Sequence, residues 1–240
     1  MTYGLNILHY KICSGNYKKH NESIMSHTFR PWEGAEGKIT TQYKIALLEM
    51  AKECIDVKEY GQAKDYLEKA LRYPENLGEG RLEGTKDNHI YYYLGICNKA
   101  LGKEQEAHGY FERASLGDIE PAGVMYYYDQ PADMILYQGL AKRELGKEKE
   151  ARSRFFKLLD YGEQHLNDEM RIEYFAVSLP DFLIFEDDLN RKNKAHCWYL
   201  MGLSSLGLGE LQKAEGFFDK ALSYDANHQN ARMYRKMTLK

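Results

Sequence analysis

One spacing template occurs four times along the chain. It consists of a small residue, an Ala twelve positions later, a bulky apolar residue four further on and, usually, another Ala three beyond that. The copies are Ala51-Ala63-Leu67-Ala70, Gly95-Ala107-Phe111-Ala114, Gly139-Ala151-Phe155-Leu158 and Gly202-Ala214-Phe218-Ala221. Spacings of three and four place residues on one face of a helix, and the small residues let a second helix approach closely. Each copy therefore predicts a hairpin of two antiparallel helices.

A turn signal accompanies three of the copies. A Gly follows the small residue by seven positions at Gly102, Gly146 and Gly209. Gly adopts the positive φ of a tight turn more readily than other residues, so it marks the break between two helices. Hairpins of this kind cannot bury their apolar faces alone and must stack on their neighbours. We therefore expect an all-α fold, a right-handed solenoid of helical hairpins.

The template also predicts how the chain is divided. The repeat region covers 41–226, with repeats at about 41–74, 88–117, 131–162 and 195–225 and a helical, apolar insert over 163–194. Residues 1–40 are expected to form a degenerate repeat or an N-terminal arm, followed by a loop. Residues 227–240 form a polar helix by pattern, and such a helix usually caps the last repeat of an array.

The four copies resemble tetratricopeptide repeats, and the resemblance covers about Thr41 to Tyr224. It implies a peptide-binding groove lined by the first helix of each hairpin. Leu48, Tyr93 and Tyr137 stand where a clamp for chaperone C-terminal tails would need polar or basic groups, so we do not expect that ligand. The resemblance gives these candidate groove residues: Lys52, His89, Tyr92, Leu136, Leu140, His196 and Tyr199.

The segments between the repeats carry a second resemblance. Arg30-Pro31-Trp32-Glu33-Gly34, Asn76-Leu77-Gly78-Glu79-Gly80, Tyr128-Asp129-Gln130-Pro131 and Tyr174-Phe175-Ala176-Val177-Ser178-Leu179-Pro180-Asp181 are similar to the repeat-bearing C-terminal part of large bacterial proteins. The N-terminal domain of those proteins is uncharacterised, with a hypothesised carbohydrate-active, β-sandwich-like architecture. The resemblance implies a companion N-terminal domain as a partner, but it does not transfer an activity to this chain.

Residues at the hairpin junctions predict an interaction surface. Junctions stack along common edges of a solenoid, so loops distant in sequence can meet, and Trp, Tyr and Arg dominate interface energetics. The alternative interpretation is that these residues only attach the long inserts to the repeats, with Trp32 buried and Arg30 paired to an acid. The candidate interaction surface consists of Arg30, Trp32, Glu33, Asn76, Glu79, Tyr128, Asp129 and Gln130.

We therefore expect a scaffold that docks a partner protein, a peptide or a companion catalytic domain. No Gly-x-Ser-x-Gly, phosphate-binding loop or Cys/His ligand spacing is present, so we predict no catalytic residue, no metal, no cofactor and no enzyme activity. The alternative function is an accessory or catalytic part of a carbohydrate-active enzyme, acting through loop aromatics and paired carboxylates. Its candidate acids are Glu33, Glu36, Glu79 and Asp181.

Charge and cysteine usage indicate which kinds of partner and which cellular compartment to expect. The formal net charge is −3 and the pI is near 6.3, which argues against a nucleic-acid partner. Four widely separated cysteines favour reduced packing residues rather than disulfides. No signal-peptide pattern occurs, and the most apolar segment is shorter than the roughly 20 residues of a membrane span. These features predict a cytoplasmic protein without membrane contact, and they leave its oligomeric state open.

Overall fold

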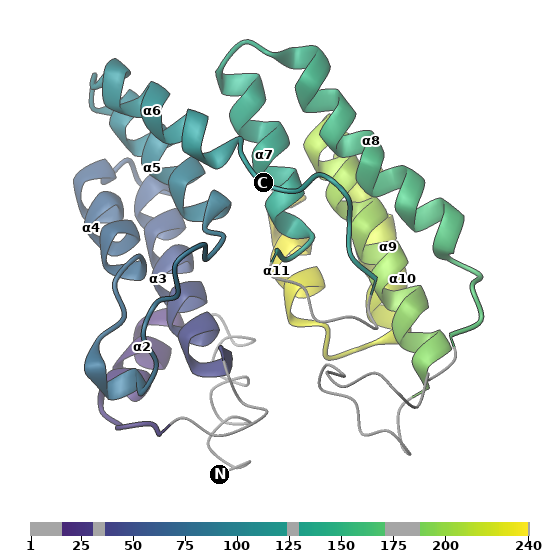
Figure 1. The fold of residues 1–240 in the computed structure, drawn as a ribbon, viewed down its shortest axis with the longest axis horizontal. Helices are drawn as coiled ribbons and strands as arrows, with labels where there is room; N and C mark the ends of the chain where they lie inside the picture. Colours follow the sequence, from purple (N-terminus) through teal and green to yellow (C-terminus); the bar gives the residue numbers. More distant parts are fainter. Residues whose placement is uncertain (1–15, 31–36, 124–129, 171–187, 240) are drawn as a thin grey trace. The chain divides into compact units, whose positions relative to one another are not determined.

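The computed structural model describes residues 16–30, 37–123, 130–170 and 188–239. Within these ranges the regular structure consists of ten α-helices and one short 3₁₀ helix, without a strand. Figure 1 shows the helices pairing as antiparallel hairpins. The predicted all-α fold of tetratricopeptide-like hairpins is therefore confirmed. The chain divides into two compact units, Met1–Ala114 and Ser115–Lys240, called unit 1 and unit 2 below.

Unit 1 contains two hairpins, formed by α3 with α4 and by α5 with α6. Its core includes Leu47 and Leu67 from the first hairpin, Leu94 from the second, and Ile24 from the preceding helix α2. Helix α2 covers the first hairpin. It lies within residues 1–40, where the sequence indicated a degenerate repeat or an N-terminal arm. The helices are α2 (Tyr17–Met25), α3 (Lys38–Asp56), α4 (Tyr60–Ala70), η1 (Glu75–Leu77), α5 (Asn88–Ala100) and α6 (Glu104–Ala114).

Unit 2 contains two further hairpins, α7 with α8 and α9 with α10, and a C-terminal helix, α11. Helix α9 is the most deeply buried of them, because it packs between α8 and α10 and also contacts α7. The helices are α7 (Asp133–Glu144), α8 (Glu148–His165), α9 (Leu189–Leu208), α10 (Leu211–Tyr224) and α11 (Gln229–Met237).

The small residue of the template touches the aromatic ring of the same copy. A Cβ atom added to Gly139 would lie 2.3 Å from a ring carbon of Phe155, closer than real Cβ atoms approach. The same approach, at 2.4 Å, occurs in two other hairpins, at Gly95–Phe111 and Gly202–Phe218. In these three copies the spacing therefore reflects a close helix crossing that only Gly fits, whereas the first copy pairs Ala51 with Leu67.

Phe155 also joins two successive hairpins of unit 2. Its ring is fully buried, and on the side facing α9 it touches Gly207, where an added Cβ atom would lie 2.3 Å from the ring. The ring thus lies between Gly139 of its own hairpin and Gly207 of the next one. Its packing contributes to the stability of both hairpins.

The turns inside the hairpins have the predicted backbone conformation. Gly102, Gly146 and Gly209 have φ values of 73°, 74° and 81°. In the first hairpin Lys58 occupies the equivalent position with a φ of 65°, and among the described residues it is the only one other than Gly with a positive φ. A residue with a Cβ atom is disfavoured in this left-handed region.

Lys58→Gly is therefore expected to stabilise the protein by about 0.5–1 kcal/mol, since the relief of the left-handed strain exceeds the added entropy of the unfolded chain. Urea unfolding followed by circular dichroism measures the change. Lys58→Ala, which keeps the Cβ atom, should give no gain. A Gly variant less stable than the parent would contradict this explanation.

Candidate interaction site

The structure describes four of the eight candidate residues at the hairpin junctions. Arg30, Asn76 and Glu79 lie in unit 1, and Gln130 lies in unit 2. Arg30 is exposed, as expected for a contact residue. Trp32, Glu33, Tyr128 and Asp129 lie outside the described residues. A patch shared by all eight residues stays a prediction.

Asn76 connects the loop after the first hairpin to the end of α2. Its side-chain Nδ2 donates to the carbonyl oxygens of Ile24, at 3.1 Å, and His27, at 2.8 Å. Its own carbonyl oxygen accepts a hydrogen bond from the backbone N–H of Phe29 at 2.7 Å. These bonds satisfy carbonyl groups that the end of a helix leaves without an intrahelical partner. Asn76 thus attaches the loop to the helical array.

Glu79 performs the corresponding role at the start of α3. The N-cap residue of α3 is Gly37, which has no side chain to accept a hydrogen bond. Glu79 Oε2 accepts one from the Gly37 backbone N–H at 2.9 Å, with the Thr40 hydroxyl a further 3.5 Å contact. A carboxylate there also interacts favourably with the positive end of the helix dipole. Glu79 therefore caps α3 from a different part of the chain.

Replacing this cap should measurably weaken unit 1. Glu79→Ala is expected to lower the free energy of unfolding by about 1 kcal/mol, the usual value of an N-cap hydrogen bond. Glu75→Ala, a change at an exposed carboxylate in η1, is the matched control and should change stability little. Equal stabilities of the two variants in thermal unfolding would show that Glu79 does not act as a cap.

Gln130 is buried rather than exposed, which corrects the expectation for this residue. Its Oε1 accepts from the backbone N–H of Asp118 at 2.9 Å, and its Nε2 donates to the Asp118 carbonyl at 2.6 Å. Gln138 of α7 donates to the same carbonyl at 2.9 Å. The two amide side chains hold the segment before α7 against that helix. Together with Asn76 and Glu79, Gln130 fits the alternative interpretation, in which such residues attach the inserts.

The candidate groove residues of unit 1 lie near one another on α3 and α5. Lys52 Nζ is 2.5 Å from Glu49 Oε1 and 5.4 Å from the centre of the Tyr93 ring. The Tyr92 ring packs edge-on against Tyr93, with centres 5.2 Å apart. Tyr92 and Tyr93 keep part of their surface exposed, whereas the side chains of Lys52 and Glu49 are only 14% and 12% exposed. We call Glu49, Lys52, Tyr92 and Tyr93 the α3–α5 patch.

His89 belongs to the buried side of this region. Burial, reinforced by the charge of Lys44, lowers the pKa of His89 to about 3, so its ring is neutral at pH 7. The residue has little exposed surface. His89 therefore offers little surface and no charge to a partner at pH 7.

A buried ion network lies beside His89, and the sequence patterns did not reveal it. The Asp87 carboxylate has no exposed surface and contacts Lys44 Nζ at 3.1 Å and Arg81 Nη2 at 2.8 Å. Asp87 occupies the N-cap position of α5, but its side chain makes no capping hydrogen bond there. The network connects α3, the loop before α5 and the N-cap position of α5.

The candidate groove residues of unit 2 are largely inaccessible. Leu136 has no exposed surface, Tyr199 is buried, and only Leu140 is half-buried. His196 is also buried, and its Nε2 lies 3.0 Å from the Ala122 carbonyl oxygen, so this nitrogen carries the proton and donates. Burial lowers the pKa of His196 to about 4, which keeps the ring neutral. The expectation of an open groove along these residues is corrected for Leu136, Tyr199 and His196.

Two segments of unit 2 account for this burial. The stretch before α7 reaches His196 through Ala122. Helix α11, drawn in yellow in Figure 1, packs mainly on α10 and reaches α7 and α9 through Tyr234. The sequence predicted a capping helix here, but not its reach to α7. The available sequence signal was the spacing of Ala231 and Tyr234, three positions apart on one helix face, and the structure buries both residues.

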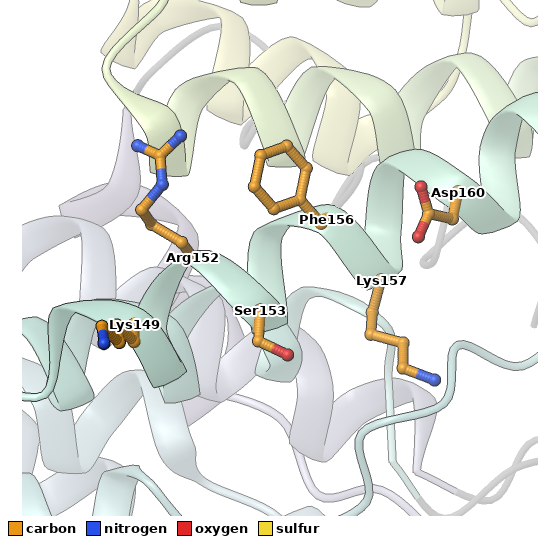
Figure 2. A pocket seen from close by; sticks show the side chains of 6 residues that line it. All are labelled: Lys149, Arg152, Ser153, Phe156, Lys157 and Asp160. Carbon is orange, nitrogen blue, oxygen red and sulfur yellow. The ribbon is translucent and has the colours of Figure 1, made fainter.

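A surface hollow of about 430 Å³ lies along α8. Figure 2 shows that its lining side chains come from this one helix and point in different directions. Phe156 lies 5.4 Å from the Arg152 guanidinium and is partly exposed. A hollow on one helix does not enclose a small molecule. The lining residues are Lys149, Arg152, Ser153, Phe156, Lys157 and Asp160.

The described part of the chain contains no group of three or more His, Cys, Asp or Glu side chains placed to hold a metal ion. Among the helices that the structure describes, none combines the length and the apolar character of a membrane span.

Comparison with known proteins identifies one repeat directly. Residues 195–228, which cover most of α9, all of α10 and the link to α11, match the family model described as Tetratricopeptide repeat. The match contains the fourth copy of the template. The tetratricopeptide character predicted from the spacing is therefore supported in this part of the chain.

Solved structures show weaker similarity. The crystal structure of MamA is 16% identical, with 92% of this chain and 95% of that chain covered and a TM-score of 0.31. The crystal structure of YrrB, described as a TPR protein with an unusual peptide-binding site, is 15% identical, with 97% and 90% covered and a TM-score of 0.32.

Proposed function

We propose that this chain is a protein-interaction module that docks a segment of a partner protein, or of a companion domain, on the helix faces of its hairpins. The observation that carries the proposal lies in unit 2, where α7, α9 and α10 together hold another helix, α11, through Tyr234. A surface that holds a helix within the chain has the shape and chemistry to hold a helix from outside.

The α3–α5 patch is the proposed docking surface of unit 1. It combines two partly exposed tyrosines with a Lys–Glu pair on adjoining first helices. Tyrosine is enriched among the residues that dominate interface energetics, and a partly exposed charged pair adds selectivity. Asn76, Glu79 and Gln130 already bond within the chain, so the proposed site moves from the insert loops to the helix faces.

The test uses the immobilised full-length chain and candidate partners, first the presumed companion N-terminal domain. Tyr93→Ala combined with Lys52→Glu is expected to weaken capture of a bound partner at least tenfold. The matched control is Tyr91→Ala on the same helix, because Tyr91 pairs instead with Arg113, whose Nη2 donates to its hydroxyl at 2.7 Å. Undiminished binding by the folded double variant would remove the α3–α5 patch from the proposal.

The carbohydrate-active alternative gains no specific support. Of its candidate acids, Glu79 caps α3, whereas Glu33, Glu36 and Asp181 lie outside the described residues. Oligosaccharide turnover by the pure chain, abolished by Glu33→Gln or Asp181→Asn, would favour this alternative over docking.

A further inference from the structure

The C-terminal helix of unit 2 is a short element held by few contacts. Helix α11 has nine residues, a length at which an isolated helix is marginal in water. Only Ala231 and Tyr234 of this helix are buried, whereas α9 buries thirteen residues. Elements with few buried contacts open at a free energy below that of global unfolding. We therefore expect α11 to detach without unfolding of the two hairpins.

Tyr234 is the anchor of this helix. Its ring centre lies 6.4 Å from Tyr137 of α7, 6.0 Å from Tyr199 of α9 and 6.4 Å from Phe218 of α10. Its hydroxyl donates to Asp133 Oδ2 at 2.9 Å. Burial, together with the Asp133 charge, raises the pKa of Tyr234 well above its usual value, so the hydroxyl keeps its proton. One side chain thus contacts three helices and satisfies one carboxylate.

The charges around Tyr234 are complementary, because α11 is basic and the surface that receives it is acidic. Arg235 Nε contacts Asp219 Oδ1 at 2.5 Å, and Nη2 contacts Glu215 Oε1 at 3.2 Å, both on α10. Helix α11 carries Arg232, Arg235 and Lys236 and no acidic residue. The receiving surface, which includes Asp133, presents carboxylates to it. The surface is therefore complementary to a basic helix that carries one aromatic anchor.

The N-terminal end of α11 completes the set of contacts. His228 is the N-cap residue, and its Nδ1 accepts a hydrogen bond from the backbone N–H of Ala231 at 3.1 Å. Its ring centre lies 4.7 Å from that of Tyr199. The cap and the anchor both touch Tyr199, so release of α11 uncovers this ring.

We propose that α11 is an exchangeable internal ligand, and that the partner of this face presents a basic amphipathic helix with the pattern Ala-x-x-Tyr-Arg. This inference rests on the proposed function and names the partner chemistry for unit 2. The face binds an external helix only in the fraction of molecules whose α11 has detached, which weakens the apparent affinity by that fraction. Loss of the α11 anchor should remove this competition.

The experiment measures binding of a fluorescent peptide, residues 225–240 of this chain, to full-length protein by anisotropy. Tyr234→Ala combined with Arg235→Glu in the protein detaches α11 and is expected to tighten peptide binding at least tenfold relative to the parent chain. The same peptide with Tyr234→Ala should lose binding. A peptide with Tyr234→Phe keeps the ring but not the bond to Asp133, so it should bind several-fold more weakly than the parent peptide.

Hydrogen exchange in the parent chain should be faster for α11 amides than for α9 and α10 amides, and equal protection would overturn the proposal. Peptide binding that is no tighter to the folded double variant than to the parent would also overturn it. A concentration-dependent dimer lost on Tyr234→Ala would replace it with helix exchange between copies. Partner capture through the α3–α5 patch tests the proposed function separately.

Discussion

Lys44→Met combined with Arg81→Met is expected to lower the free energy of unfolding by about 3–5 kcal/mol, the cost of leaving a buried charge without its partners. The two cations hold the Asp87 carboxylate, which has no exposed surface, whereas they themselves are partly exposed. Removing both leaves Asp87 in a poorly solvated position without compensation. Urea unfolding followed by circular dichroism gives the difference.

Removing the carboxylate instead of the two cations separates the cost of a buried charge from the cost of lost side-chain packing. Asp87→Asn should cost less, because Lys44 and Arg81 retain enough exposure to regain water. The triple variant with all three substitutions should recover much of the loss, since replacing a whole buried ion network is often close to neutral. A triple variant no more stable than the double variant would show that aliphatic packing of Lys44 and Arg81, and not the network, is responsible.

Phe155→Ala is expected to cost about 3–5 kcal/mol, the usual loss for truncating a fully buried aromatic residue. The cost should lie toward the upper end, because Gly139 and Gly207 have no side chains with which to fill the cavity. Phe156→Ala is the matched control: the neighbouring ring is 39% exposed, so its loss should cost far less. Similar losses in thermal unfolding for the two variants would mean that the ring between the two glycines is not a principal contact.

The hairpins could be predicted from the sequence because their determinants are local. Gly202 and Phe218 are sixteen residues apart, and both lie in one hairpin, so a fixed spacing reports their contact directly. The turn position was predictable for the same reason, and Lys58 adopts the conformation that the template assigns to Gly. Fold class follows from such short-range patterns.

The site was less predictable because its contacts are long-range. Asp87 pairs with Lys44 across 43 positions, and Tyr234 bonds to Asp133 across 101 positions. Neither pair repeats along the chain, so no spacing rule identifies it. Polar loop residues looked available for a partner for a related reason. The sequence does not show that the side chains of Glu79 and Gln130 already accept hydrogen bonds from backbone N–H groups elsewhere in the chain.

The contact between Phe155 and Gly207 has a consequence for how this gene can change. The positions equivalent to Gly207 in the preceding first helices hold Asp56, Ala100 and Glu144, each of which carries a Cβ atom. Among these four helices, only α9 therefore lacks a Cβ atom at this position, which in α9 contacts the ring of the preceding hairpin. Recombination that exchanged hairpins at their boundaries would set the Phe155 ring against a side chain. We therefore expect these two hairpins to keep their serial order when repeats are exchanged.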